Sequence, residues 1–360
     1  MVAGAQQEGA RPRLSALFSL SRTAHALGSP SFTPQGVSDA GWLLNAPHPT
    51  PEQFAAAFPL APPAWGQLAS GPAAGSADVQ VTWMGHACCL VQMQGLTFLT
   101  DPALGERCAP VQWAGPKRLV PVPFDVCDSR VPAADFILIS HSHFDHLCYA
   151  TVKKLLNTAT SQHSACRWFV PLGLKAWLVS AGVRADRIIE LDWWQESDAV
   201  PGVRIACTPA QHWTARAPWD RCASLWCGWA VLGADAPAAA APQRRPSFWF
   251  AGDSGYCDVF KDIGARYGGF TCAAIPIGAY APRWFHGPAH MDPAEAVKVH
   301  SDVGAQHSVA IHHATWALTD EALDEPVQEL GEACGRDGVE SFVAVKHGET
   351  RLFTASAGAL

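Results

Sequence analysis

The feature that most constrains this chain is the segment His-Ser-His-Phe-Asp-His at positions 141–146. It directly follows the continuous apolar run DFILIS, which is typical of a buried β-strand. Alternate side chains at a strand end lie on one side, so His141 and His143 are expected to share one metal ion. The turn that follows would direct Asp145 and His146 toward a second, adjacent position. Imidazole and carboxylate are ligands of catalytic zinc, and burying four such groups without partners would be costly, so the segment predicts a metal centre rather than a polar turn.

Three further ligand-type residues follow apolar strands elsewhere in the chain. His212 comes after VRIACTPAQ, Asp253 after SFWFAG and His312 after SVAI. Open sheets gather their sites at the carboxyl ends of strands, so these side chains are expected to join the 141–146 segment. A carboxylate such as Asp253 can place one oxygen on each of two metal ions, although an Asp is also common in turns. His313 is a direct rival of His312.

From residue 79 onward, short strands and helices are interleaved, which predicts an α/β fold of two mixed sheets covered by helices, an αββα sandwich. A meander of three strands opens it, and the FILIS strand follows. Later strands are expected at 188–193, 203–209, 247–252, 272–278, 308–313, 342–348 and 350–354. Helices are expected at 148–157, 173–182, 258–266 and 320–334, with one more opened by Asp292-Pro293.

Composition changes along the chain predict its domain organisation. Residues 1–77 are rich in Pro, Ser and Ala, and are expected to form a partly disordered N-terminal extension before the α/β domain at 78–355. The Ala/Pro-rich stretch 234–247 is expected to be a disordered insertion. Arginines at 11, 13 and 22 around LSALFSL resemble a weak organelle-targeting segment, and a frayed terminus is the simpler interpretation.

Composition also excludes several classes of protein. A hydrophobic fraction of 49% with 16% charged residues is that of a folded chain, and no apolar run approaches the ~20 residues of a membrane-spanning helix. A net charge of -7 gives no general attraction to nucleic acid. The 12 cysteines contain no CxxC pair, which favours a reduced, cytoplasmic protein.

Longer motifs then point to a family. The stretches WMGHA, FLTDP, GPKR, LISHSHFDHL, WFVPLGL, IELDWW, FAGDSGYC, IPIGAYAPRWF, DPAEAV and AIHHATWAL lie between about residues 81 and 353. The chain resembles the metallo-β-lactamase superfamily and, within it, the N-acylphosphatidylethanolamine-hydrolysing phospholipases D. The histidine segment specifies only the superfamily, whereas GPKR, WFVPLGL, ELDWW and IGAYAPRWF together are much more specific for the phospholipase branch and its bacterial relatives.

This resemblance implies two zinc ions and a phosphodiester hydrolysis. One ion would be bound by His141, His143, His212 and Asp253, and the other by Asp145, His146, Asp253 and His312. The zinc ions would lower the pKa of a bridging water toward ~7, so that hydroxide attacks the phosphorus. The implied products are phosphatidic acid and an N-acylethanolamine. The implied catalytic residues are Asp145, Asp253 and His290.

Substrate contacts are implied less directly, because this chain departs from the family pattern. The family's Gln-Tyr pair is Gln112-Trp113 here, and its Lys-Arg pair is Ala215-Arg216. We expect Arg216, helped by Gln112, to contact the lipid phosphate, with His290 as a further contact. His86 in WMGHA is expected to be a buried structural residue.

The expected partner is a phospholipid met at a membrane surface, by a cytoplasmic and peripherally associated protein. No nucleic acid is expected, and a homodimer is left open. A dizinc lactonase or a soluble phosphodiesterase is the alternative within the superfamily. An iron-dependent redox enzyme and a binding module without catalysis are the alternatives outside it. Metal analysis would distinguish the redox enzyme from the hydrolases.

Overall fold

The structure is a computed structural model, which describes residues 56–73, 75–157, 159–233 and 245–355. Its first sheet has seven strands in the order β14-β1-β2-β3-β4-β5-β6. In chain order these are β1 (Val79–Gly85), β2 (Cys88–Met93), β3 (Leu96–Thr100), β4 (Phe136–Leu138), β5 (Arg167–Pro171), β6 (Ile188–Leu191) and β14 (Thr350–Phe353). β1, β2 and β3 form the antiparallel meander, and β3 to β6 pair in parallel.

The second sheet also has seven strands, in the order β13-β12-β11-β10-β9-β8-β7. These are β7 (Glu196–Ser197), β8 (Val203–Thr208), β9 (Gly228–Gly233), β10 (Ser247–Phe250), β11 (Phe270–Pro276), β12 (Ala305–Ile311) and β13 (Phe342–Val343). The pairs β10–β11, β11–β12 and β12–β13 are parallel, whereas the pairs β7–β8, β8–β9 and β9–β10 are antiparallel. Both sheets are therefore mixed, as expected.

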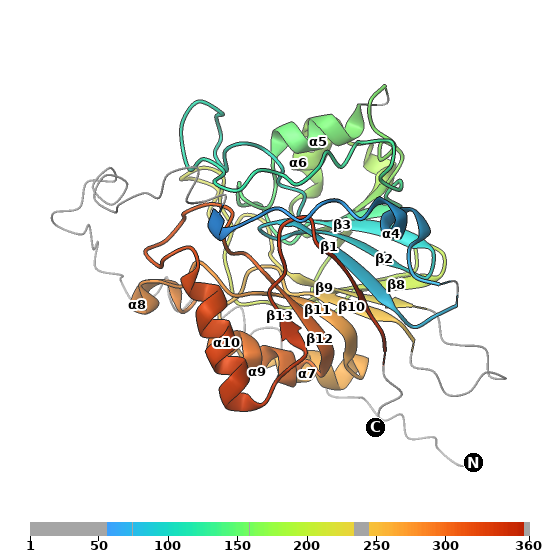
Figure 1. Cartoon of the computed structure of the whole chain (residues 1–360). Helices are drawn as coiled ribbons and strands as arrows, with labels where there is room; N and C mark the ends of the chain where they lie inside the picture. The colour runs from blue at the N-terminus through green and yellow to red at the C-terminus, as the bar shows by residue number, and fades with distance from the viewer. Residues whose placement is uncertain (1–55, 74, 158, 234–244, 356–360) are drawn as a thin grey trace, which may run out of the picture. The chain divides into compact units, whose positions relative to one another are not determined.

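The two sheets pack face to face and each is covered by helices on its outer face (Figure 1). Aromatic side chains from both sheets fill the core between them, including Trp83, Phe98, Trp229 and Phe248. The helices beside the first sheet are α4 (Trp65–Ser70), α5 (Tyr149–Leu156) and α6 (Lys175–Ser180), with the 3₁₀ turn η1 (Ala185–Arg187). The second sheet is covered by α7 (Val259–Tyr267), α9 (Pro293–Asp302) and α10 (Glu325–Asp337). The short helix α8 (Arg283–His286) precedes α9. This confirms the αββα sandwich.

Strand direction decides where the polar residues gather. β1, β3 and β4 run in the same direction within the first sheet, and β8, β10 and β12 do so within the second. Side chains that follow the carboxyl ends of these strands therefore collect at common sheet edges. Every ligand-type residue predicted from the sequence follows one of these strands.

Some boundaries differ from the expectations. Helix α10 begins at Glu325 rather than near residue 320, because Pro326 has no N–H to donate and is favoured in a helix's first turn. Leu68 of α4 is fully buried in the core beside the first sheet, so the domain begins before residue 78. Ser247 already belongs to β10, so the insertion ends earlier than 247. The rest of that insertion (234–244) and the targeting segment lie outside the described residues.

Candidate metal centre

Three histidines from two sheets bring their ring nitrogens together. His141 and His143 follow β4 of the first sheet, and His212 follows β8 of the second. The Nδ1 atom of His143 lies 2.8 Å from Nε2 of His141 and 3.2 Å from Nε2 of His212. Ligand atoms that bind one zinc ion tetrahedrally lie about 3.3 Å apart. The three nitrogens therefore have the spacing of one ligand set.

A second set lies beside the first. The Oδ2 atom of Asp145 is 3.5 Å from Nε2 of His146 and 3.6 Å from Nε2 of His312. The same two nitrogens lie 3.0 and 3.1 Å from Oδ2 of Asp253. Two carboxylates and two imidazoles thus surround one position at the ends of β4, β10 and β12.

Asp253 lies between the two sets. In addition to its contacts with His146 and His312, its Oδ2 atom is 3.8 Å from Nε2 of His141 and 3.7 Å from Nε2 of His212. Its side chain is almost completely buried. No other carboxylate among the described residues approaches nitrogens of both sets so closely. A carboxylate in this place can contact two cations at once.

The polar atoms of this cluster fit a metal ion better than they fit one another. Within the described part of the chain, Nε2 of His146, Nε2 of His312 and Oδ1 of Asp253 are buried without a hydrogen-bond partner. Buried polar atoms without partners are rare in folded proteins, because each loses its hydration. Their convergence, with imidazole nitrogen and carboxylate oxygen donors mixed, matches the ligand chemistry of zinc and of similar divalent ions.

Neighbouring groups fix which ring nitrogen of His141, His146 and His212 faces the centre. Nδ1 of His146 lies 2.6 Å from a carboxylate oxygen of Asp101, and His212 directs its Nδ1 to the carbonyl of Ala289 at 2.9 Å. Nδ1 of His141 lies 2.8 Å from the hydroxyl of Ser140, which also donates to Asp101. Such outer partners commonly orient metal-binding histidines. Asp101 follows β3 directly, so the strand-end rule used for the other ligands could have found it.

Burial and charge set the protonation of the cluster. Burial is the main cause that lowers the pKa of His141 and of His212, so both rings are held in the neutral form that binds metals. Burial also acts on His312, but the carboxylates of Asp253 and Asp145 outweigh it and raise the pKa of this ring to about 9. His312 is therefore protonated at neutral pH when no cation neutralises the two carboxylates.

His86 takes a larger part than the sequence indicated. Its Nε2 atom lies 2.9 Å from Oδ2 of Asp145, and its ring packs against that of His312 with centroids 3.9 Å apart. Burial, followed by the nearby His312, lowers the pKa of His86 to about 3, so a neutral ring donates this hydrogen bond. The backbone of His86 has a left-handed φ of 52° directly after β1. WMGHA contains one isolated histidine, so the sequence alone did not predict the contact between His86 and Asp145.

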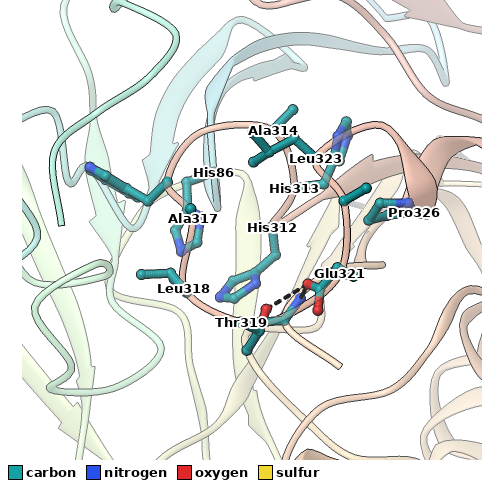
Figure 2. Close-up of a pocket in the computed structure, with 13 residues that line it drawn as sticks. His86, His312, His313, Ala314, Ala317, Leu318, Thr319, Glu321, Leu323 and Pro326 are labelled. Atoms are coloured by element: carbon teal, nitrogen blue, oxygen red, sulfur yellow. Dashed lines mark hydrogen bonds between the residues drawn. The ribbon is translucent and has the colours of Figure 1, made fainter. Parts of the chain in front are cut away.

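Figure 2 shows a small pocket beside the centre, and His86 and His312 form part of its lining. Its volume is about 20 Å³, roughly the size of one water molecule. Glu321 lies on the opposite wall, where it accepts hydrogen bonds from the hydroxyl of Thr319 at 2.7 Å and from the amide of Ala279 at 2.6 Å. This pocket is too small to hold a substrate, so we assign its lining residues to supporting the centre rather than to binding a substrate.

The residues that were expected to contact the substrate lie in different surroundings. The ring of His290 lies 5.0 Å from that of His212 and 5.4 Å from that of His312, so it borders the centre. The amide of Gln112 bonds both the N–H and the carbonyl of Arg107, and the indole of Trp113 is 82% exposed. Arg216 directs its guanidinium to the backbone of the 141–147 segment rather than outward.

Comparison with known proteins places the chain in a family. Residues 97–313 match the model of the Beta-lactamase superfamily domain. An N-acyl-phosphatidylethanolamine-hydrolyzing phospholipase D 1 of Caenorhabditis elegans is 43% identical over 279 residues, which cover 74% of each protein. This chain belongs to that phospholipase family of the β-lactamase superfamily. It is a metal-dependent hydrolase, as its resemblance had indicated.

Other relatives are more distant. A mitochondrial N-acyl-phosphatidylethanolamine-hydrolyzing phospholipase D of Saccharomyces cerevisiae is 33% identical over 254 residues, covering 69% of this chain and 50% of the yeast protein. The crystal structure of an isothiocyanate hydrolase from Delia radicum gut bacteria covers 77% of this chain and 100% of that protein, with a TM-score of 0.57 and 22% identity. The latter likeness concerns the fold alone. Among the described residues, no helix has the length and apolar character needed to span a bilayer.

Proposed function

We propose that this protein is a zinc-dependent phosphodiesterase of the phospholipase D type, which hydrolyses N-acylphosphatidylethanolamine to phosphatidic acid and an N-acylethanolamine. The position of Asp253 between two sets of imidazole nitrogens is the observation that carries the proposal. It is supported by the 43% identity to the Caenorhabditis elegans phospholipase over most of both chains.

Seven residues would hold two zinc ions. One set consists of His141, His143, His212 and Asp253, and the other of Asp145, His146, Asp253 and His312. Zinc ions bound there would supply Lewis acidity toward a phosphoryl group and lower the pKa of a water molecule. Asp253 and Asp145 would hold the two sets in fixed positions, while Asp101 and His86 orient the ligands from outside.

His290 would act on the substrate as a neutral ring rather than as a charged proton donor to the leaving alkoxide. Burial is the main cause that lowers the pKa of His290 to about 3, so its ring is neutral at pH 7. Its Nδ1 atom is buried without a hydrogen-bond partner in the described part of the chain. A neutral ring at the border of the centre can donate one hydrogen bond to a phosphoryl or leaving-group oxygen.

We also propose that the lipid is met at a membrane surface. Four aromatic side chains are largely exposed, namely Trp113, Trp219, Trp284 and Phe285. Trp219 follows His212 along the chain, and the last two lie on α8, just before His290. Exposed aromatic rings can enter the boundary between lipid headgroups and acyl chains.

The test is a substrate panel for zinc-loaded protein, with a chelator-treated sample as control. The panel contains N-acylphosphatidylethanolamine and phosphatidylcholine vesicles, bis(p-nitrophenyl) phosphate and an acyl-homoserine lactone, with products identified by mass spectrometry. We expect the highest kcat/KM on the N-acylated lipid and no hydrolysis of any substrate in the chelated sample. A higher kcat/KM on the lactone or on the soluble diester would establish the alternative activity instead.

A further inference from the structure

The ligand-bearing segment after β4 has little regular structure to hold it. Four of the seven proposed ligands lie between His141 and His146, and the backbone there is a turn in which the amides of His146 and Leu147 both donate to the carbonyl of His143. These two bonds close the turn itself. Contacts with the second sheet hold the residues just before it, because the indole of Trp229 donates to the carbonyl of Ile139 at 2.9 Å and the amide of Cys227 donates to the carbonyl of Ser140 at 3.0 Å. The residues from Ser142 to Leu147 need a further contact.

Arg216 makes that contact. Its Nη1 atom donates to the carbonyl of Ser142 at 2.7 Å and to the carbonyl of Leu147 at 2.8 Å, near the two ends of the ligand-bearing segment. The guanidinium also stacks over the ring of Phe144, in the middle of the segment, at 4.1 Å. The indole of Trp177 lies 4.7 Å from the same group. One side chain thus holds the beginning, middle and end of the segment.

The backbone of Arg216 is itself fixed. Its amide and that of Ala217 both donate to Oδ1 of Asp220 at 2.8 Å, which closes a tight turn. Arg216 stands four residues after His212, on the connection that follows β8 of the second sheet. Its contacts therefore join the segment that carries His212 to the segment that carries His141 and His143.

We propose that Arg216 is a positioning residue for the metal centre, which sets the gap between the ligands of the two sheets. This role rests on the proposed metal centre, and it differs from the phosphate contact expected from the sequence. A planar guanidinium suits it, because one group donates to two carbonyls and stacks on an aromatic ring at once. In the described structure, both hydrogen bonds of this guanidinium go to the protein backbone.

The two roles predict different defects. A positioning residue that acts on metal ligands changes metal affinity by ~10–100-fold when it is removed. A phosphate contact instead changes kcat/KM on the lipid and leaves metal affinity unchanged. Metal affinity can be measured without any lipid, so the outcome does not depend on which substrate the enzyme prefers.

The experiment measures zinc affinity by competition with a chromophoric chelator for wild type, Arg216→Ala, Arg216→Gln and Arg187→Ala. Arg187 is the matched control, because its Nη1 atom also donates to a backbone carbonyl, that of Ala165 at 2.7 Å, in an exposed place away from the centre. Far-UV circular dichroism of the metal-free proteins establishes folding, and kcat and KM are then measured at saturating zinc.

We expect Arg216→Ala to weaken zinc affinity at least tenfold, with KM within twofold of wild type at saturating zinc. Arg216→Gln keeps an amide donor but no charge, so we expect an intermediate loss, and Arg187→Ala should match wild type. Zinc affinity of a folded Arg216→Ala within twofold of wild type would overturn the proposal. If that variant does not fold, unchanged affinity in Arg216→Gln would overturn it equally.

Discussion

At the scale of single residues, Asp253 is the position on which both ligand sets depend. Its Oδ2 atom lies 3.0 Å from His146 and 3.7 Å from His212, one in each set. Asp253→Asn keeps the size of the side chain but removes its charge, so the cations would lose their shared counter-charge. We expect kcat/KM to fall by more than the ~100-fold typical of an outer partner, and bound zinc to fall at both positions.

His212→Ala is the comparison, because it removes a ligand from one set only. Zinc content measured by elemental analysis should be lower in Asp253→Asn than in His212→Ala, and activity should follow the same order. If Asp253→Asn kept two zinc ions per chain and a near-normal rate, Asp253 would not link the sets.

Seven side chains that the structure places in one cluster could be predicted from the sequence, because each follows an apolar strand. Asp101 obeys the same rule, but a single aspartate in FLTDP lacks the repeated histidines that drew attention to 141–146. His86 obeys the rule too, since β1 ends at Gly85, but neither its role nor that of Arg216 could be predicted in this way. Their roles depend on contacts with Asp145 and with Ser142, which lie 59 and 74 positions away in the chain.

At the scale of elements, helix α9 carries a capping box that fixes the segment before it. The carboxylate of Asp292 accepts from the amide of Glu295 at 2.8 Å, and Glu295 accepts in return from the amide of Asp292 at 3.2 Å. Arg283 contacts both carboxylates and donates to the carbonyl of His290 at 2.7 Å. The start of α9 and the place of His290 are therefore linked.

Asp292→Ala should consequently lower the free energy of unfolding by ~1 kcal/mol, or the melting temperature by ~2 °C. Asp258→Ala is a matched control, because Asp258 directly precedes α7 and its side chain makes no capping hydrogen bond among the described residues, only an exposed ion pair with Lys261 at 2.7 Å. Differential scanning calorimetry at pH 7.5 compares the two variants. Equal shifts in both would show that the capping box of α9 adds no stability.

Local patterns predicted α9 well, because Asp292, Pro293 and Glu295 are all start signals within four residues. The same reasoning placed the start of α10 about five residues too early, where the sequence TDEALDEP offers several acidic start signals before Pro326. Strand β5 was not predicted. Its sequence, RWFVP, is too short for a period and becomes a strand only by pairing with β4 and β6.

At the scale of the whole molecule, the centre lies where the two sheets meet at the ends of their strands. The first sheet supplies His141, His143, Asp145 and His146, and the second supplies His212, Asp253 and His312. The sandwich itself could be predicted from the order of strands and helices. The distance between the sheets could not, because it is set by the aromatic core between them and by contacts such as those of Arg216.

Metal-dependent hydrolysis of the phosphodiester is tested most directly by following oxygen from water into the products. N-acylphosphatidylethanolamine vesicles are hydrolysed in ¹⁸O-labelled water by the zinc-loaded protein, and the masses of both products are measured by mass spectrometry. Water that attacks the phosphorus breaks the bond from phosphorus to the ethanolamine oxygen. We therefore predict one ¹⁸O atom in phosphatidic acid, unlabelled N-acylethanolamine, and no products after chelation. Label in the N-acylethanolamine, or undiminished turnover in the chelated sample, would contradict a metal-dependent phosphodiesterase.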